Sequence, residues 1–130
     1  MWRVLLIFFL ISAARAQIVV DYPKSGSVFP PDFAPPTFLF HDPSAASAWR
    51  IEVKLGGKAK AVTAECKCEP MRVGEIDQRV VSTSNELPSL TPEQQKLRAW
   101  KPDPATWAAI RKGSLGKPAV LTFIGLAGGA

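Results

Sequence analysis

The stretch WRIEVKLGG, residues 49–57, contains the clearest periodic pattern in the chain. Apolar and charged residues alternate strictly through its first seven positions, as in a strand with one face toward a core and the other toward water. The pair Gly56-Gly57 suits the two central positions of a tight hairpin turn, because both positions need a positive φ. We therefore expect residues 58–65 to return as the partner strand.

Shorter apolar runs on either side of this hairpin predict further strands, and twelve prolines separate them. The prolines of residues 30–36 exclude a helix or a central strand there, so we expect an extended surface segment. The expected strands are 18–20, 37–40 and 119–124, with weaker candidates at 71–76 and 79–82.

Two helix starts precede the last expected strand. Residues Thr91 to Gln94 combine a capping hydroxyl, a proline at the first helical position and a glutamine three residues after the cap. This pattern predicts a helix to about Trp100. Asp103-Pro104 repeats the start, and Gly113 is a candidate stop for the second helix.

These elements predict a mainly β fold of six or seven short strands. Short strands, proline-rich turns and one alternating hairpin favour a β-sandwich with one or two short helices inserted before the last strand. We expect the sandwich to span residues 17–125, followed by a flexible tail or truncated linker at 126–130.

The first sixteen residues have the pattern of a signal peptide. A positive start is followed by eight apolar residues, 4–11, and by small residues at Ala14 and Ala16, which predicts cleavage before Gln17. The apolar run is too short to span a bilayer, so we expect an exported protein, periplasmic or extracellular, without a stable membrane anchor. Removing residues 1–16 lowers the net charge from +5 to +3. This small charge is interleaved with acidic residues and argues against nucleic-acid binding.

Two cysteines, Cys66 and Cys68, are the one feature with possible metal or redox chemistry. Cysteines two apart on a strand share a face and could hold a soft ion such as Cu(I), with Met71 as the nearest third ligand. An oxidising compartment favours a disulfide instead, either local or to another chain. A local pair that caps a loop is the favoured interpretation, and metal binding and thiol exchange stay open.

The residues His41, Asp42 and Ser44 suggest a hydrolase at first sight. A catalytic triad needs a base oriented by a carboxylate across the fold, whereas adjacent strand residues point to opposite faces. A turn in which Asp42 caps backbone amides before Pro43 is the better interpretation. We expect neither an enzyme nor a cofactor.

The tryptophans that follow the signal sequence can be interpreted in two ways. Trp100 and Trp107 could form an exposed aromatic platform for sugars, as in a carbohydrate-binding module. Alternatively, they pack the predicted helices against the sheet, while Trp49 faces the core. Exposure of Trp100 and Trp107 distinguishes the two.

The first half of the chain resembles bacterial fibronectin-type-III-like or immunoglobulin-like sandwich modules. Those modules have a proline and glycine turn, an aromatic strand and then an alternating strand, and here Phe40 stands where they carry a tryptophan. The residues that carry this resemblance are Pro23, Gly26, Phe29, Pro36, Phe38, Phe40 and Trp49 to Val53.

A narrower resemblance covers the whole chain after the signal peptide. The segments GSVFPPDFAPPTF at 26–38, NELP and LTPEQ within 85–94, and Trp100 to Trp107 are similar to the leading domain of large exported bacterial proteins. In such proteins a cytochrome-c-type Cys-x-x-Cys-His segment and propeller-like or tetratricopeptide repeats follow. That pentapeptide is not in this sequence, so no haem role is carried over. The resemblance implies a non-catalytic binding or structural module whose partners are other domains of its parent chain or other extracytoplasmic proteins.

Overall fold

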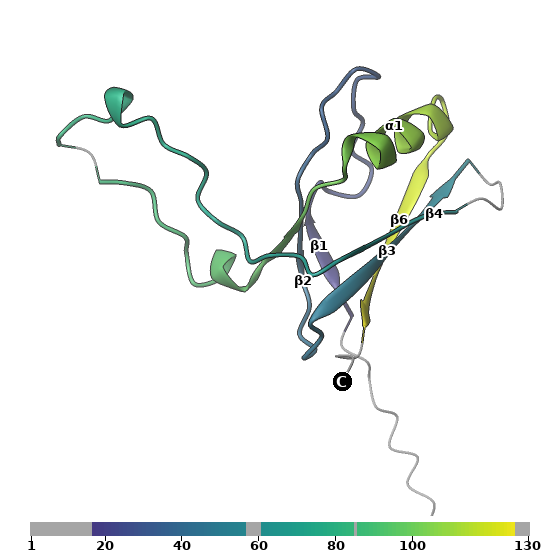
Figure 1. Cartoon of the computed structure of the whole chain (residues 1–130), viewed down its shortest axis with the longest axis horizontal. Helices are drawn as coiled ribbons and strands as arrows, with labels where there is room; N and C mark the ends of the chain where they lie inside the picture. The colour runs from purple at the N-terminus through teal and green to yellow at the C-terminus, as the bar shows by residue number, and fades with distance from the viewer. Residues whose placement is uncertain (1–16, 57–60, 85, 127–130) are drawn as a thin grey trace, which may run out of the picture.

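The computed structural model describes residues 17–56, 61–84 and 86–126, which form two antiparallel sheets and one α-helix (Figure 1). The predicted signal peptide, residues 57–60 with the start of the predicted return strand, residue 85 and the last four residues of the predicted tail lie outside this description. Within the described residues, no helix combines the length and apolar character needed to cross a membrane.

The predicted hairpin is confirmed and lies in the first of the two sheets. Strand β3 (Ala48–Leu55) pairs antiparallel with β4 (Ala61–Cys66) on one side and with β6 (Ala119–Leu126) on the other. The sheet therefore has the order β4-β3-β6, and β6 extends one residue beyond the predicted domain limit. The alternation seen in the sequence points Trp49 and Ile51 into the core, where both are buried.

The second sheet has the order β1-β2-β5. It consists of β1 (Val19–Tyr22), β2 (Phe38–His41) and β5 (Arg98–Trp100), all antiparallel. Since the described residues form six strands and one α-helix, the mainly β prediction is confirmed.

Aromatic side chains join the two sheets into one core. Phe40 of β2 is fully buried, with its ring centroid 4.8 Å from that of Phe123 on β6 and 5.5 Å from that of Trp49 on β3. Phe38 lies beside Trp100 within the second sheet and also reaches Phe123. We call the two sheets and the helix together the β body.

The helix α1 (Pro104–Gly113) confirms the second helix prediction. Asp103 caps it by accepting a hydrogen bond of 2.8 Å from the backbone N–H of Thr106. Hydrogen bonds from Thr106 hold the pKa of Asp103 below its ordinary value. Trp107 and Ile110 lie on the buried face of α1 and close one end of the core.

The helix predicted from Thr91 to Trp100 is wrong. The capping box does form, since Gln94 N–H donates to Thr91 Oγ1 at 3.2 Å and Thr91 N–H donates to Gln94 Oε1 at 2.9 Å. Only a single 3₁₀ turn, η2 (Gln94–Lys96), follows before the chain enters β5. Pairing with β2 places Trp100 opposite Phe38 in the core, and this tertiary contact overrides the local helix signal.

The weak strand candidates at 71–76 and 79–82 are also wrong. These residues belong to a long excursion between β4 and β5, residues 69–96, which we call the arm. The arm contains a 3₁₀ turn, η1 (Gln78–Val80), and leaves the β body in Figure 1 as the teal and green segment. The β-branched residues of the two predicted strands have no partner strand in the described part of the chain. Strand propensity in the sequence is therefore not sufficient to form a strand here.

Candidate functional site

The cysteine pair lies where the arm leaves the β body. Cys66 is the last residue of β4, and a disulfide joins it to Cys68, with a Cα–Cα distance of 5.1 Å. Cys68 is buried in the core cluster, and its φ of 38° turns the chain toward the arm. Of the alternatives that the sequence left open, the structure contains the local disulfide. Both thiols are used in it, which leaves Met71 without the two soft partners that a Cu(I) site would need.

Backbone hydrogen bonds hold the base of the arm against β5. The N–H of Ala99 donates to the carbonyl of Glu69 at 2.9 Å, and the N–H of Met71 donates to the carbonyl of Leu97 at 2.9 Å. Pro70 lies between these bonds, opposite Arg98 in an isolated bridge. The first residues of the arm therefore run along the outer edge of β5 and occupy its hydrogen-bonding groups. The arm is thus anchored to the β body at its base.

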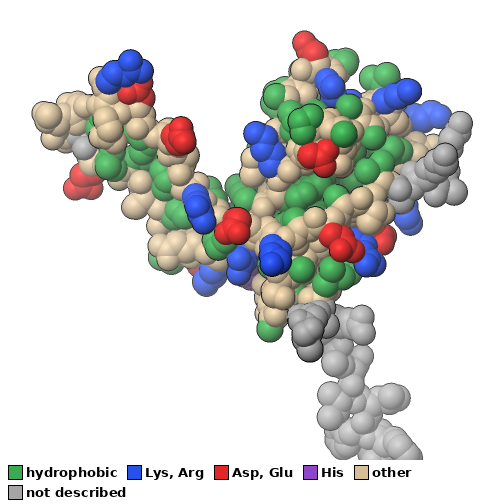
Figure 2. All heavy atoms as spheres, viewed as in Figure 1, with side chains coloured by type: hydrophobic (Ala, Val, Ile, Leu, Met, Phe, Trp, Pro, Cys, Tyr) green, Lys and Arg blue, Asp and Glu red, His purple; other side chains and the backbone are tan. Residues whose placement is uncertain are grey.

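Beyond its base, the arm exposes apolar side chains. Val80 is 80 % exposed, and Val73 and Leu87 are exposed as well. Figure 2 shows apolar side chains along the arm, which stands apart from the β body. Exposed apolar side chains on a segment that stands apart from a folded body make that segment a candidate contact surface for another molecule. The sequence pattern did not indicate this surface, because its apolar residues predicted strands in one part of the arm and a helix in another.

Hydrogen bonds fix the outer turn of the arm. Asp77 accepts hydrogen bonds from both the backbone and the guanidinium of Arg79, the shortest at 2.7 Å. These bonds lower the pKa of Asp77 and raise the pKa of Arg79. The pair orders the start of η1 and leaves the side chain of Val80 pointing into solvent.

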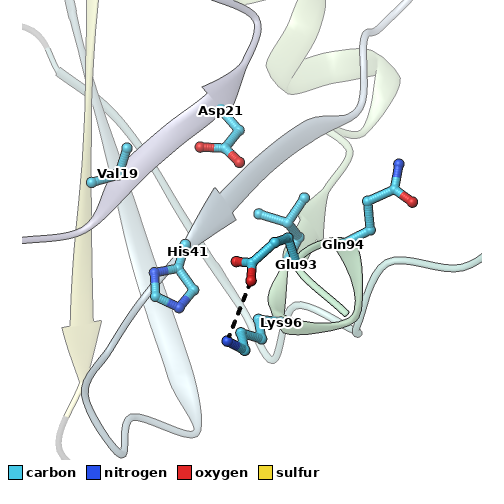
Figure 3. A pocket seen from close by; sticks show the side chains of 7 residues that line it. Val19, Asp21, His41, Glu93, Gln94 and Lys96 are labelled. Atoms are coloured by element: carbon cyan, nitrogen blue, oxygen red, sulfur yellow. Dashed lines mark ion pairs between the residues drawn. The ribbon is translucent and has the colours of Figure 1, made fainter. Parts of the chain in front are cut away.

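A groove of about 360 Å³ lies between β1, β2 and η2 (Figure 3). It brings together charges of both signs, including Asp21 of β1 and an ion pair in which Lys96 Nζ lies 3.8 Å from Glu93 Oε1. The described residues contain no cluster of three or more His, Cys, Asp or Glu side chains suited to a metal ion. The groove is a surface hollow in which charged side chains of both signs lie beside apolar ones. Its lining residues are Val19, Asp21, His41, Glu93, Gln94, Lys96 and Leu97.

Asp42 forms the predicted turn and also a contact that the sequence did not indicate. Its Oδ1 accepts from the backbone N–H of Ser44 at 2.8 Å, and its Oδ2 accepts from the indole N–H of the buried Trp49 at 2.8 Å. Partial burial acts to raise the pKa of Asp42, but the hydrogen bonds from Ser44 and Trp49 outweigh it and hold the pKa below its ordinary value. The carboxylate is therefore committed to the turn and the core, and it does not orient His41 as a triad would require.

This hydrogen bond predicts a pH dependence of stability. A carboxylate with a lowered pKa in the folded state stabilises the fold above its unfolded pKa, and the stabilisation is lost as the pH falls through the folded pKa. We expect Asp42→Asn to lower the free energy of unfolding by about 1–2 kcal/mol near pH 7, because it weakens a charged hydrogen bond to Trp49. Below about pH 4 the difference from wild type should shrink.

Urea unfolding of both proteins at a series of pH values checks this prediction. Asp77→Asn is the matched control, because the pKa of Asp77 is lowered too but its partner Arg79 lies on the arm. The control should leave the unfolding of the β body unchanged. Parallel pH profiles for wild type and Asp42→Asn would contradict the assignment.

Trp100 and Trp107 are both buried, each 6 % exposed. The indole of Trp100 packs against Phe38 at a centroid distance of 5.3 Å, and the indole N–H of Trp107 donates to the carbonyl of Phe33 at 2.7 Å. Neither ring presents a plane to solvent, so these two residues do not form the sugar platform considered above. The interpretation as packing residues fits their positions.

Comparison of the chain with protein-family models, curated proteins and solved structures gave no match. The fold and the site are therefore characterised by their geometry alone. They define a small two-sheet β protein with an anchored arm that exposes apolar side chains.

Proposed function

We propose that this chain is a non-catalytic, exported binding or structural module that leads a larger protein. Its arm is the surface that contacts a neighbour, either another domain of the parent chain or a separate extracytoplasmic protein. The observation that carries this proposal is the exposure of Val73, Val80 and Leu87 on a segment that hydrogen bonds anchor at its base.

The order of the strands supports an immunoglobulin-like or fibronectin-III-like sandwich as the fold of this module. On this proposal β1, β2 and β5 are assigned to strands A, B and E, and β4, β3 and β6 to strands C′, C and F. Aromatic contacts between the two sheets fit this assignment, and α1 occupies the connection between the fifth and sixth strands.

Two features support export. The first is the signal-peptide pattern of residues 1–16. The second is the disulfide between Cys66 and Cys68, since disulfides persist in oxidising compartments and are rare in the cytosol. We therefore propose that the mature chain begins at Gln17 and acts outside the cytoplasm.

Site-specific photo-crosslinking in an exporting bacterium tests the arm as the contact surface. A photo-reactive amino acid at Val80 should give covalent adducts with a discrete neighbour, whereas the same residue at Thr63, exposed on β4, should not. Equal adducts at both positions, or none at Val80, would contradict the proposal.

Edman sequencing of the recovered protein should start at Gln17, and an intact Met1 would contradict the proposed export.

An arm-shortened variant shows whether the arm is needed for folding. None of residues 73–84 or 86–91 is buried, so replacing residues 73–91 with a short Gly-Ser linker should leave the β body folded. We expect the free energy of unfolding to change by less than about 1 kcal/mol, because loop-closure entropy varies slowly with loop length. Residue 80 is absent from this variant, so the variant reports on folding alone, whereas crosslinking at Val80 of the full chain reports on binding. Failure of this variant to unfold cooperatively would instead assign the arm a structural role within the β body.

A further inference from the structure

The strand β6 has an open edge. One side of β6 is paired with β3 along its whole length, and no strand among residues 17–56, 61–84 and 86–126 pairs with the other side. Unpaired backbone N–H and C=O groups on such an edge are a template for a further strand. The open edge of β6 runs from Ala119 to Leu126.

The other three outer strands carry features that discourage pairing. The edge of β5 is occupied by the base of the arm. Strand β1 has only four residues, with Asp21 among them and an irregular register. Strand β4 includes Glu65 and ends at the disulfide. Short length, charged residues and bulges are the devices by which sheets protect their edges.

Strand β6 has none of these devices. Its eight residues, AVLTFIGL, include no charged side chain and no proline. Its outward face is uncharged, with Val120 56 % exposed and Thr122 and Ile124 on the same face, whereas the neighbouring outward residues of β3 are charged. A strand without charges on either face is typical of the interior of a wider sheet.

We propose that the open edge of β6 pairs with β6 of a second copy of this chain. The pairing is antiparallel about a two-fold axis at Thr122, so that Thr122 lies opposite the partner's Thr122. On the inward face Leu121 lies opposite the partner's Phe123, and on the outward face Val120 lies opposite the partner's Ile124. The two β4-β3-β6 sheets then form one continuous six-stranded sheet.

This strand is suited to its own copy because the register is self-complementary at every position. Apolar residues meet apolar residues on both faces, the central threonines form a favourable cross-strand pair, and no charged side chain lies opposite another. An isologous interface needs this property, since each contact occurs twice. The proposal concerns β6 and does not rest on the arm. An immunoglobulin-like sandwich carries its next strand on this edge, so a following segment of a parent chain that pairs with β6 would overturn the proposal.

Disulfide trapping of the full chain, produced in an exporting host, tests the register. Thr122→Cys should give covalent dimers on oxidation, because directly opposed residues of antiparallel strands have Cα atoms within disulfide range. Thr63→Cys is the matched control, since it places the same side chain on the exposed face of the opposite outer strand, β4. Equal trapping at both positions would overturn the proposal.

Light scattering on the native chain measures the dimer directly, and Thr122→Lys tests the edge. We expect the wild type to dimerise and Thr122→Lys to weaken the dimer by roughly tenfold or more, because two ammonium groups would face each other at the axis. Thr63→Lys should leave the dimer unchanged, and circular dichroism should show that both variants are folded. A monomeric wild type, or a dimer that Thr122→Lys does not weaken, would overturn the proposal.

Discussion

Replacing Phe40 with alanine should lower the free energy of unfolding by about 3–5 kcal/mol. Phe40 is fully buried on the central strand β2 and packs against Trp49 and Phe123 of the opposite sheet. Its removal deletes the ring that connects the two sheets and leaves a cavity that the rigid neighbouring strands cannot fill completely. A loss of this size is a large fraction of the total stability of a small domain.

Urea unfolding followed by tryptophan fluorescence measures this loss, with Val80→Ala as the control. Val80 is on the arm and largely exposed, so its truncation should change the free energy of unfolding by less than about 0.5 kcal/mol. Phe40→Leu keeps most of the apolar volume and remains measurable if Phe40→Ala does not fold. If Phe40→Ala behaved like Val80→Ala, the two sheets would not share the core described above.

The sequence predicted those elements of the fold whose signal is local and periodic. The hairpin of β3 and β4 has strict alternation, and α1 has both a cap and buried residues at helical spacing. The segment around Gln94 has an equally good cap. Its downstream residue Trp100 belongs to β5, however, where it pairs with Phe38 of β2 instead of continuing a helix. A capping box shows where a helix can start, and only tertiary contacts decide whether it continues.

Much of the candidate site could not be predicted for the same reason. The contact between Asp42 and Trp49 depends on the turn geometry between two strands, and the groove joins β1 and β2 to a turn some fifty residues later. The arm has neither a regular period nor a low-complexity composition. That this segment is an excursion anchored to the β body follows only from the hydrogen bonds between its base and β5. The sequence did indicate the disulfide between Cys66 and Cys68 as the favoured outcome, because the chain has no other cysteine with which either could pair.

Replacing Trp107 with alanine should also cost about 3–5 kcal/mol, and it should release the proline-rich segment at residues 30–36. Trp107 is buried on α1, and its indole N–H donates to the carbonyl of Phe33. Phe29 packs edge-on against the same indole at a centroid distance of 6.1 Å. This one side chain thus holds both the helix and the segment before β2 on the end of the core.

Limited chymotrypsin digestion tests the local part of this prediction, because cleavage after Phe33 requires the segment to detach from the indole of Trp107. Trp107→Ala should be cut there faster than wild type under conditions in which the β body remains folded. Trp107→Phe separates the two contributions, since it keeps an aromatic ring but leaves the carbonyl of Phe33 without its donor. We expect this variant to lose only about 1–2 kcal/mol and to show intermediate cleavage. Cleavage of Trp107→Ala at the wild-type rate would mean that the polar contact of Arg111 with Pro31 is sufficient to hold the segment.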